Sequence, residues 1–174
     1  VGSIFNRRRV PALIRAFGSM ARRHRHASLD IVGDNRTYPF QDLRQTIAHE
    51  GLADCVQWHQ YVTDDQLAGL YRSARAFAFL SEYEGLGMTP LEALASGVPP
   101  LLLDTAVARE SCGDAALYVR ADDLRATSEC LERLLLDETT RMRLLAAAPA
   151  TLERYSWPRA AREVMELLQS SARQ

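Results

Sequence analysis

The 174-residue chain is long enough for one domain with a substantial core, and 47% hydrophobic and 25% charged residues are the proportions of an ordinary globular domain. A net charge of −1 provides no overall field that would attract nucleic acid or an acidic membrane surface. All 21 basic residues are arginine, which excludes a Schiff-base lysine and a P-loop lysine.

Predicted helices and strands alternate along the chain. Apolar residues recur at three- and four-residue steps from Val10 to Ala21, with arginines on the other face, which predicts an amphipathic helix. Val1–Ser3 resemble the end of a strand whose beginning lies before this chain. Further helices are expected at about 40–49, 64–74, 90–96, 124–135, 139–148 and 157–170. Strands are expected at about 29–32, 55–58, 76–81, 98–104 and 115–119.

This alternation predicts an α/β domain, a Rossmann-like doubly wound parallel sheet with helices on both faces, spanning residues 1–174. In such sheets ligands bind outside the carboxyl ends of the strands. The candidate binding loops therefore follow the strands, at residues 2–9, 33–38, 59–63 and 81–89.

The stretch SEYEGLGMTPLEALASG, residues 81–97, combines a glycine-rich loop with a helix start. Thr89 is expected as the N-cap, with Pro90 in the first turn and Glu92 at the third helical position. The unpaired N–H groups of that turn carry partial positive charge. Gly85 and Gly87 let the preceding backbone approach a ligand closely. Together these features predict a phosphate-binding site.

Two carboxylates flank this predicted phosphate site, Glu84 before it and Glu92 after it. Carboxylates accept hydrogen bonds from sugar hydroxyls, so the pair suits a nucleoside diphosphate sugar. A purely structural interpretation stays open: Glu92 is equally consistent with a capping box, and Glu84 with a solvated loop residue.

The string from Glu84 to Glu92 closely resembles the E-x7-E signature of the group 1 retaining glycosyltransferases (family 4, GT-B architecture). The segments VGSIFNRRRVPALIRAF, IVGDN, QYVTDDQLAGLYRSARAF, ALASGVPPLLLD and GDAALYV are also similar to that family and follow in its order. The resemblance covers nearly the whole chain.

The resemblance implies roles for particular residues. Glu84, the catalytic candidate, would hold hydroxyls of the donor sugar, and Glu92 would hold the ribose. Arg8 would meet the diphosphate, with Arg7 or Arg9 as alternatives through a one-residue slip, and Ser3 takes the place of a frequent arginine. The remaining donor-binding candidates are Tyr61 and Val62, near the nucleobase, and the loop residues Gly85, Leu86, Gly87, Met88 and Thr89.

The resemblance further implies that this chain is the C-terminal, donor-binding half of a GT-B enzyme whose N-terminal acceptor domain lies outside it. The reaction would be retaining hexose transfer from a nucleoside diphosphate sugar to a sugar or lipid-linked acceptor. No metal, other cofactor or nucleic acid partner is expected. By itself the chain would keep the donor pocket and show little or no turnover.

Three separated cysteines, Cys55, Cys112 and Cys130, fit no metal spacing or disulfide framework and favour a reducing compartment. We expect a cytoplasmic location, with the longer protein able to associate peripherally with the inner membrane face. Two other functions stay open. One is a nucleotide-sugar epimerase of similar fold. The other is a non-catalytic nucleotide-sugar-binding or interaction module in which Glu84 and Glu92 are structural.

Overall fold

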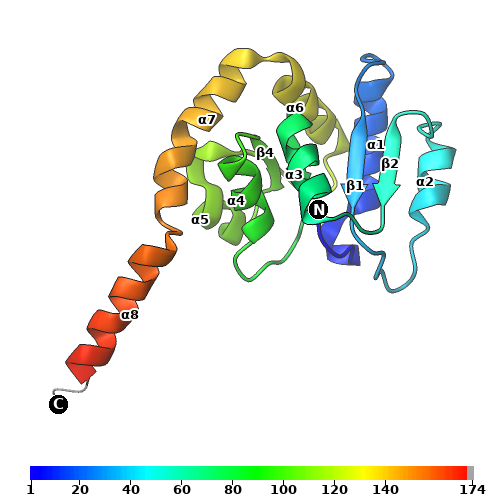
Figure 1. The fold of residues 1–174 in the computed structure, drawn as a ribbon. Helices are drawn as coiled ribbons and strands as arrows, with labels where there is room; N and C mark the ends of the chain where they lie inside the picture. The colour runs from blue at the N-terminus through cyan, green and yellow to red at the C-terminus, as the bar shows by residue number, and fades with distance from the viewer. Residues whose placement is uncertain (172–174) are drawn as a thin grey trace.

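The computed structural model describes residues 1–171, which form an α/β domain (Figure 1). The helices are α1 (Val10–Ala21), α2 (Leu43–His49), α3 (Asp64–Ser73), α4 (Met88–Ala95), α5 (Ala106–Cys112), α6 (Leu124–Leu136), α7 (Glu138–Glu153) and α8 (Trp157–Ser171). The strands are β1 (Leu29–Val32), β2 (Val56–His59), β3 (Phe77–Phe79), β4 (Pro100–Leu103) and β5 (Leu117–Val119). Two 3-10 turns are η1 (Asn6–Arg8) and η2 (Gly113–Ala115).

All strand pairs of the two sheets are parallel, so the predicted fold class is confirmed. The described strands form two sheets rather than one, with β1 beside β2 and with the order β3-β4-β5. Strands that follow one another pair directly within each sheet, and the helices between them supply the crossovers.

Helices cover both faces of the strands. Successive strand residues point to opposite sides, so apolar residues on both sides need helices to bury them. On β4, Leu101 belongs to one buried cluster and Leu102 to a second. The first cluster contains residues of α1, α2 and α6, and the second contains residues of α3, α4 and α5. This arrangement leaves the carboxyl ends of the strands for the loops that carry the candidate site.

Two local sequence signals define helix ends. Thr63 caps α3, and its side chain and that of Gln66 form a reciprocal capping box. Gly97 follows α4 with a φ of 75°, the left-handed conformation that ends a helix.

Two predicted helix starts were wrong, and one helix was not predicted. α4 begins at Met88 rather than near Pro90, because Gly87, with a φ of 76°, is the N-cap and turns the chain earlier. α2 begins at Leu43 rather than near residue 40, because Asp42 accepts the N–H of Gln45. The sequence interpretation missed α5, whose start is capped by Thr105.

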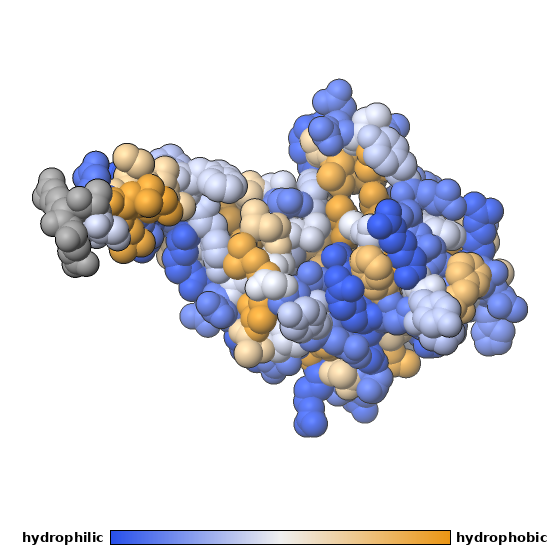
Figure 2. Space-filling view, turned by 90° about the horizontal axis from the view of Figure 1, so that it is seen from below, coloured by the Kyte–Doolittle hydropathy of each residue, from blue (hydrophilic) through white to orange (hydrophobic). Residues whose placement is uncertain are grey.

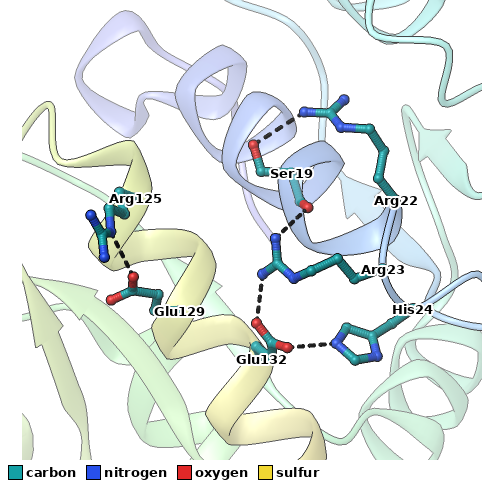
Figure 3. A network of polar contacts seen from close by, with 7 residues as sticks. All are labelled: Ser19, Arg22, Arg23, His24, Arg125, Glu129 and Glu132. Atoms are coloured by element: carbon teal, nitrogen blue, oxygen red, sulfur yellow. Dashed lines mark hydrogen bonds and ion pairs between the residues drawn. The ribbon is translucent and has the colours of Figure 1, made fainter.

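A polar network holds the end of α1 against α6 (Figure 3). The Glu132 carboxylate accepts from Arg23 at 2.5 Å and lies 2.6 Å from the His24 ring nitrogen. Arg23 also donates to the Ser19 carbonyl oxygen at 2.9 Å. Hydrogen bonds from Arg23 and His24 lower the pKa of Glu132.

Replacing Glu132 with glutamine should lower the melting temperature at neutral pH, and the difference from wild type should shrink on acidification. A carboxyl whose pKa is lowered by folding stabilises above its unfolded pKa, and that stabilisation is lost as pH falls through the folded pKa. Thermal denaturation from about pH 7 to about pH 3 measures the effect. Glu129→Gln is the control, because Glu129 pairs with Arg125 on α6 itself. A difference that does not change with pH would contradict the assigned role.

Helix α8 projects from the body of the domain (Figure 1), and none of its residues is buried. Hydrophobic atoms gather along this projecting helix in Figure 2. Its exposed apolar side chains are Trp157, Val164, Met165, Leu167 and Leu168. Within residues 1–171, no helix combines the length and the hydropathy needed to cross a membrane.

Candidate functional site

The turn η1 and the loop after β3 meet although they are far apart in the sequence. The Glu82 N–H donates to the Arg7 carbonyl oxygen at 2.9 Å, and Arg7 Nε donates to the Tyr83 carbonyl oxygen at 3.1 Å. These bonds fix the arginine-rich turn beside the loop that leads into α4.

The three consecutive arginines have different partners. Arg8 lies 3.3 Å from the Glu84 carboxylate, whereas Arg9 pairs with Glu82 and Asp122. Of the alternatives Arg7, Arg8 and Arg9, the structure therefore brings Arg8 to the first glutamate of the motif.

The Arg8 guanidinium is largely enclosed. It lies 4.5 Å from the centre of the Phe79 ring and donates to the Val1 carbonyl oxygen at 3.0 Å. Burial lowers the pKa of Arg8, and the neighbouring Glu84 carboxylate opposes that shift. The Nε atom is buried and makes no hydrogen bond within the described residues. The Arg8 guanidinium is thus a partly desolvated cation, and its contact with the Glu84 carboxylate offsets part of the cost of burial.

The Glu84 carboxylate is held from a second side by a residue that sequence reasoning missed. The buried Ser81 hydroxyl donates to Glu84 Oε1 at 2.8 Å. Phe79, beneath Arg8, was also missed as a site residue. Phe79 lies in a run of apolar residues with Ala78 and Leu80, and such a run predicts a buried strand and not a binding site. Ser81, at the carboxyl end of the same strand, could have been found from its position.

The start of α4 offers unpaired backbone donors. Gly87 is the N-cap, and no side chain caps the helix. The first-turn N–H groups of Met88 and Thr89 therefore have no intrahelical partner, and they carry the positive end of the helix dipole. Gly85 and Leu86 lie in the loop just before this helix start and are exposed. A small cavity of about 20 Å³, lined in part by Glu84, Leu86 and Gly87, lies beside it.

Glu92 does not form the capping box that was considered as a structural explanation, because α4 begins too early for it to occupy the third position. It lies exposed in the second turn of α4. Burial, and then the nearby Glu92 carboxylate, raise the pKa of the Tyr71 hydroxyl. That hydroxyl is buried and makes no hydrogen bond among the described residues.

The other candidates lie on neighbouring loops. Tyr61 and Val62 follow β2, and the Tyr61 side chain is 84% exposed. Ser3 lies near the Asp34 carboxyl, whereas Arg8 lies near Glu84. Hydrogen bonds from Arg36 and from Ser3 lower the pKa of Asp34. Across residues 1–171, no group of three histidine, cysteine or acidic side chains is placed to hold a metal ion.

Residues 1–151 match the family model of the glycosyl transferases group 1. The chain belongs to this family. The matched range includes Arg8, Glu84 and the start of α4. Parallel strands with helices on both faces are the architecture of one GT-B domain.

Among similar proteins is the O-antigen chain mannosyltransferase B of Escherichia coli, 28% identical over 157 residues, covering 90% of this chain and 41% of the relative. The GDP-mannose:cellobiosyl-diphosphopolyprenol alpha-mannosyltransferase of Xanthomonas oryzae pv. oryzae is 34% identical over 122 residues, covering 67% of this chain and 31% of the relative. This group 1 glycosyl transferase chain therefore spans less than half the length of either relative.

One similar solved structure is the C-terminal domain of a group 1 glycosyl transferase from Francisella tularensis. It superposes with a TM-score of 0.76 at 16% identity, over 88% of this chain and 82% of that one. At this identity the likeness shows the fold.

Proposed function

We propose that this chain is the C-terminal, donor-binding domain of a two-domain GT-B glycosyltransferase of family 4. The complete enzyme transfers a hexose from a nucleoside diphosphate sugar to a sugar or lipid-linked acceptor, with retention at the anomeric carbon. The names of the two relatives support mannose as the sugar and GDP as its carrier. The acceptor is bound by the other domain, so the isolated chain has little or no turnover.

The observation that carries this proposal is the uncapped start of α4 beside the Arg8–Glu84 pair. The leaving diphosphate accepts hydrogen bonds from Met88 and Thr89 N–H groups and from the Arg8 guanidinium. These donors stabilise the charge that develops as the glycosidic bond breaks. Helix dipole and arginine together supply this stabilisation without a metal ion.

The two glutamates divide the sugar hydroxyls between them. Glu84, held by Ser81 and Arg8, accepts from hydroxyls of the donor hexose. Glu92 accepts from the ribose hydroxyls, and Tyr61 and Val62 lie at the nucleobase. Ser3, which faces Asp34, contributes least to this arrangement. The epimerase and the non-catalytic module receive no support from the family match.

Isothermal titration with GDP, UDP and ADP in the presence of EDTA tests the proposal. We expect GDP to bind, and Glu92→Ala to weaken that binding by about 1–3 kcal/mol, the scale of a hydrogen bond to a charged group. Glu129→Ala, on the distant helix α6, is the matched control and should bind GDP as the wild type does. Failure of all three nucleotides to bind a chain that remains folded would overturn the proposal.

A further inference from the structure

A row of aromatic rings connects the Arg8 guanidinium to a buried tyrosine. Arg8 lies over Phe79, and Phe79 stacks on Phe77 with the ring centres 6.0 Å apart. Phe77 in turn packs against Tyr71, at 6.1 Å between ring centres. Tyr71 lies in the last turn of α3 and is 8% exposed. The row therefore ends in the interior of the domain, at a side chain that carries a hydroxyl.

The packing of this row does not require the Tyr71 hydroxyl. Phe77 and Phe79 fill the neighbouring positions with plain phenyl rings, and both are buried. The Tyr71 oxygen is withdrawn from water and makes no hydrogen bond within residues 1–171. An unpaired buried hydroxyl costs free energy that phenylalanine would avoid. Such a group points to a partner that the hydroxyl gains when a ligand is bound.

The Glu92 carboxylate is the acceptor that lies near this hydroxyl. Leu91, the preceding residue of α4, belongs to the same buried cluster as Tyr71, so this part of α4 borders the tyrosine ring. Burial, and then the Glu92 carboxylate, raise the pKa of the Tyr71 hydroxyl. A raised pKa keeps the proton on the oxygen at neutral pH, so the hydroxyl is available as a donor.

The two glutamates of the candidate site differ in how they are held. Glu84 accepts from the Ser81 hydroxyl and lies against Arg8. Glu92 is exposed, so its side chain is free to adopt several rotamers, and ordering it costs conformational entropy. Accepting both hydroxyls of a ribose requires one particular orientation of the carboxylate. A donor fixed in the interior, such as the Tyr71 hydroxyl, favours one orientation over the others.

We propose that Tyr71 is a positioning residue for the ribose of the nucleotide. Its hydroxyl donates to the Glu92 carboxylate and holds that carboxylate in the orientation that accepts the ribose hydroxyls. The hydrogen bond forms as the nucleotide orders the Glu92 side chain, and Tyr71 itself touches neither the sugar nor the diphosphate. This inference rests on the proposed function, because it requires Glu92 to bind the ribose.

Isothermal titration of the 174-residue chain with GDP and with 2′,3′-dideoxy-GDP tests this role. Tyr71→Phe should weaken GDP binding by about fivefold or more, because the Glu92 carboxylate loses a hydrogen bond that orients it. The affinity for dideoxy-GDP should stay within about twofold of wild type, because that ligand has no ribose hydroxyls. In a Glu92→Ala background, Tyr71→Phe should not weaken GDP binding further.

Tyr118→Phe is the matched control. It also removes the hydroxyl of a partly buried tyrosine, but this hydroxyl donates to the Gly113 carbonyl oxygen at 2.7 Å. Tyr118→Phe should therefore lower the melting temperature and leave the GDP affinity unchanged. Tyr71→Phe should show the opposite pattern, with no loss of melting temperature, because the hydroxyl that it removes is unpaired within residues 1–171 of the free chain.

Two kinds of result would overturn the inference, and they differ in what they say of the proposed function. If Glu92→Ala weakens GDP binding but Tyr71→Phe does not, Tyr71 does not position Glu92, and the proposed function stands. Equal weakening of GDP and dideoxy-GDP by Tyr71→Phe leads to the same conclusion. If GDP does not bind, or if Glu92→Ala leaves GDP binding unchanged, the ribose role of Glu92 fails and the role of Tyr71 fails with it.

Discussion

Replacing Glu84 with glutamine is expected to slow sugar transfer by the complete two-domain enzyme about a hundredfold or more, the scale for losing one preorganised polar contact in a transition state. Glutamine keeps the size of the side chain and an acceptor for the Ser81 hydroxyl, but it loses the charge that faces Arg8 and the sugar hydroxyls. Steady-state kinetics with the nucleoside diphosphate mannose donor measure the change.

Two comparisons make this result specific. GDP alone should bind the Glu84→Gln variant about as tightly as wild type, because the assigned contact is to the sugar and not to the diphosphate. Glu82→Gln changes the neighbouring carboxylate, which pairs with Arg9, and should leave the transfer rate within about threefold of wild type. Equal rate losses in the two variants would show that Glu84 only supports the loop.

Replacing Gly33 with alanine is expected to destabilise the domain by about 3 kcal/mol or more. An added Cβ would lie 2.1 Å from the Gly2 carbonyl oxygen, and the φ of 142° is one that side-chain-bearing residues rarely adopt. The atoms nearest to this Cβ, the Gly2 carbonyl oxygen and carbon, belong to the backbone, so relieving the clash would require moving the segment that leads into η1. Urea denaturation measures the loss.

Gly51→Ala provides the matched comparison for this variant. Gly51 also has a positive φ, of 68°, but an added Cβ would meet nothing within 4 Å. Only the left-handed backbone penalty remains, about 1–2 kcal/mol. If both variants lost the same stability, the close approach of Gly2 to Gly33 would not be what makes glycine necessary there.

Much of the fold could be predicted because its signals are local. The apolar periodicity from Val10 to Ala21 gave α1 its extent, and Thr63 and Gly97 marked a helix start and a helix end. The start of α4 was misplaced because Thr89, Pro90 and Glu92 imitate a capped helix start. Gly87 adopts a left-handed conformation instead, which the sequence pattern allowed but did not require.

The loop and helix of the candidate site could be predicted from the sequence, but the arginine that pairs with Glu84 could not. The Glu84–Glu92 spacing and the two glycines marked the loop and helix. The choice of Arg8 over Arg7 and Arg9 depends on bonds between η1 and the loop after β3, which lie more than 70 positions apart. No local pattern encodes such a contact.

The contact between α1 and α6 bears on the order of folding. Arg23 and Glu132 meet across 109 positions of sequence (Figure 3), whereas neighbouring strands within each sheet are joined by single short helices. Contacts of long sequence separation form late, because a large chain loop must close first. We therefore expect the docking of α1 on α6 to be a late step of folding. Mutations at Arg23 would then speed unfolding while leaving the folding rate almost unchanged.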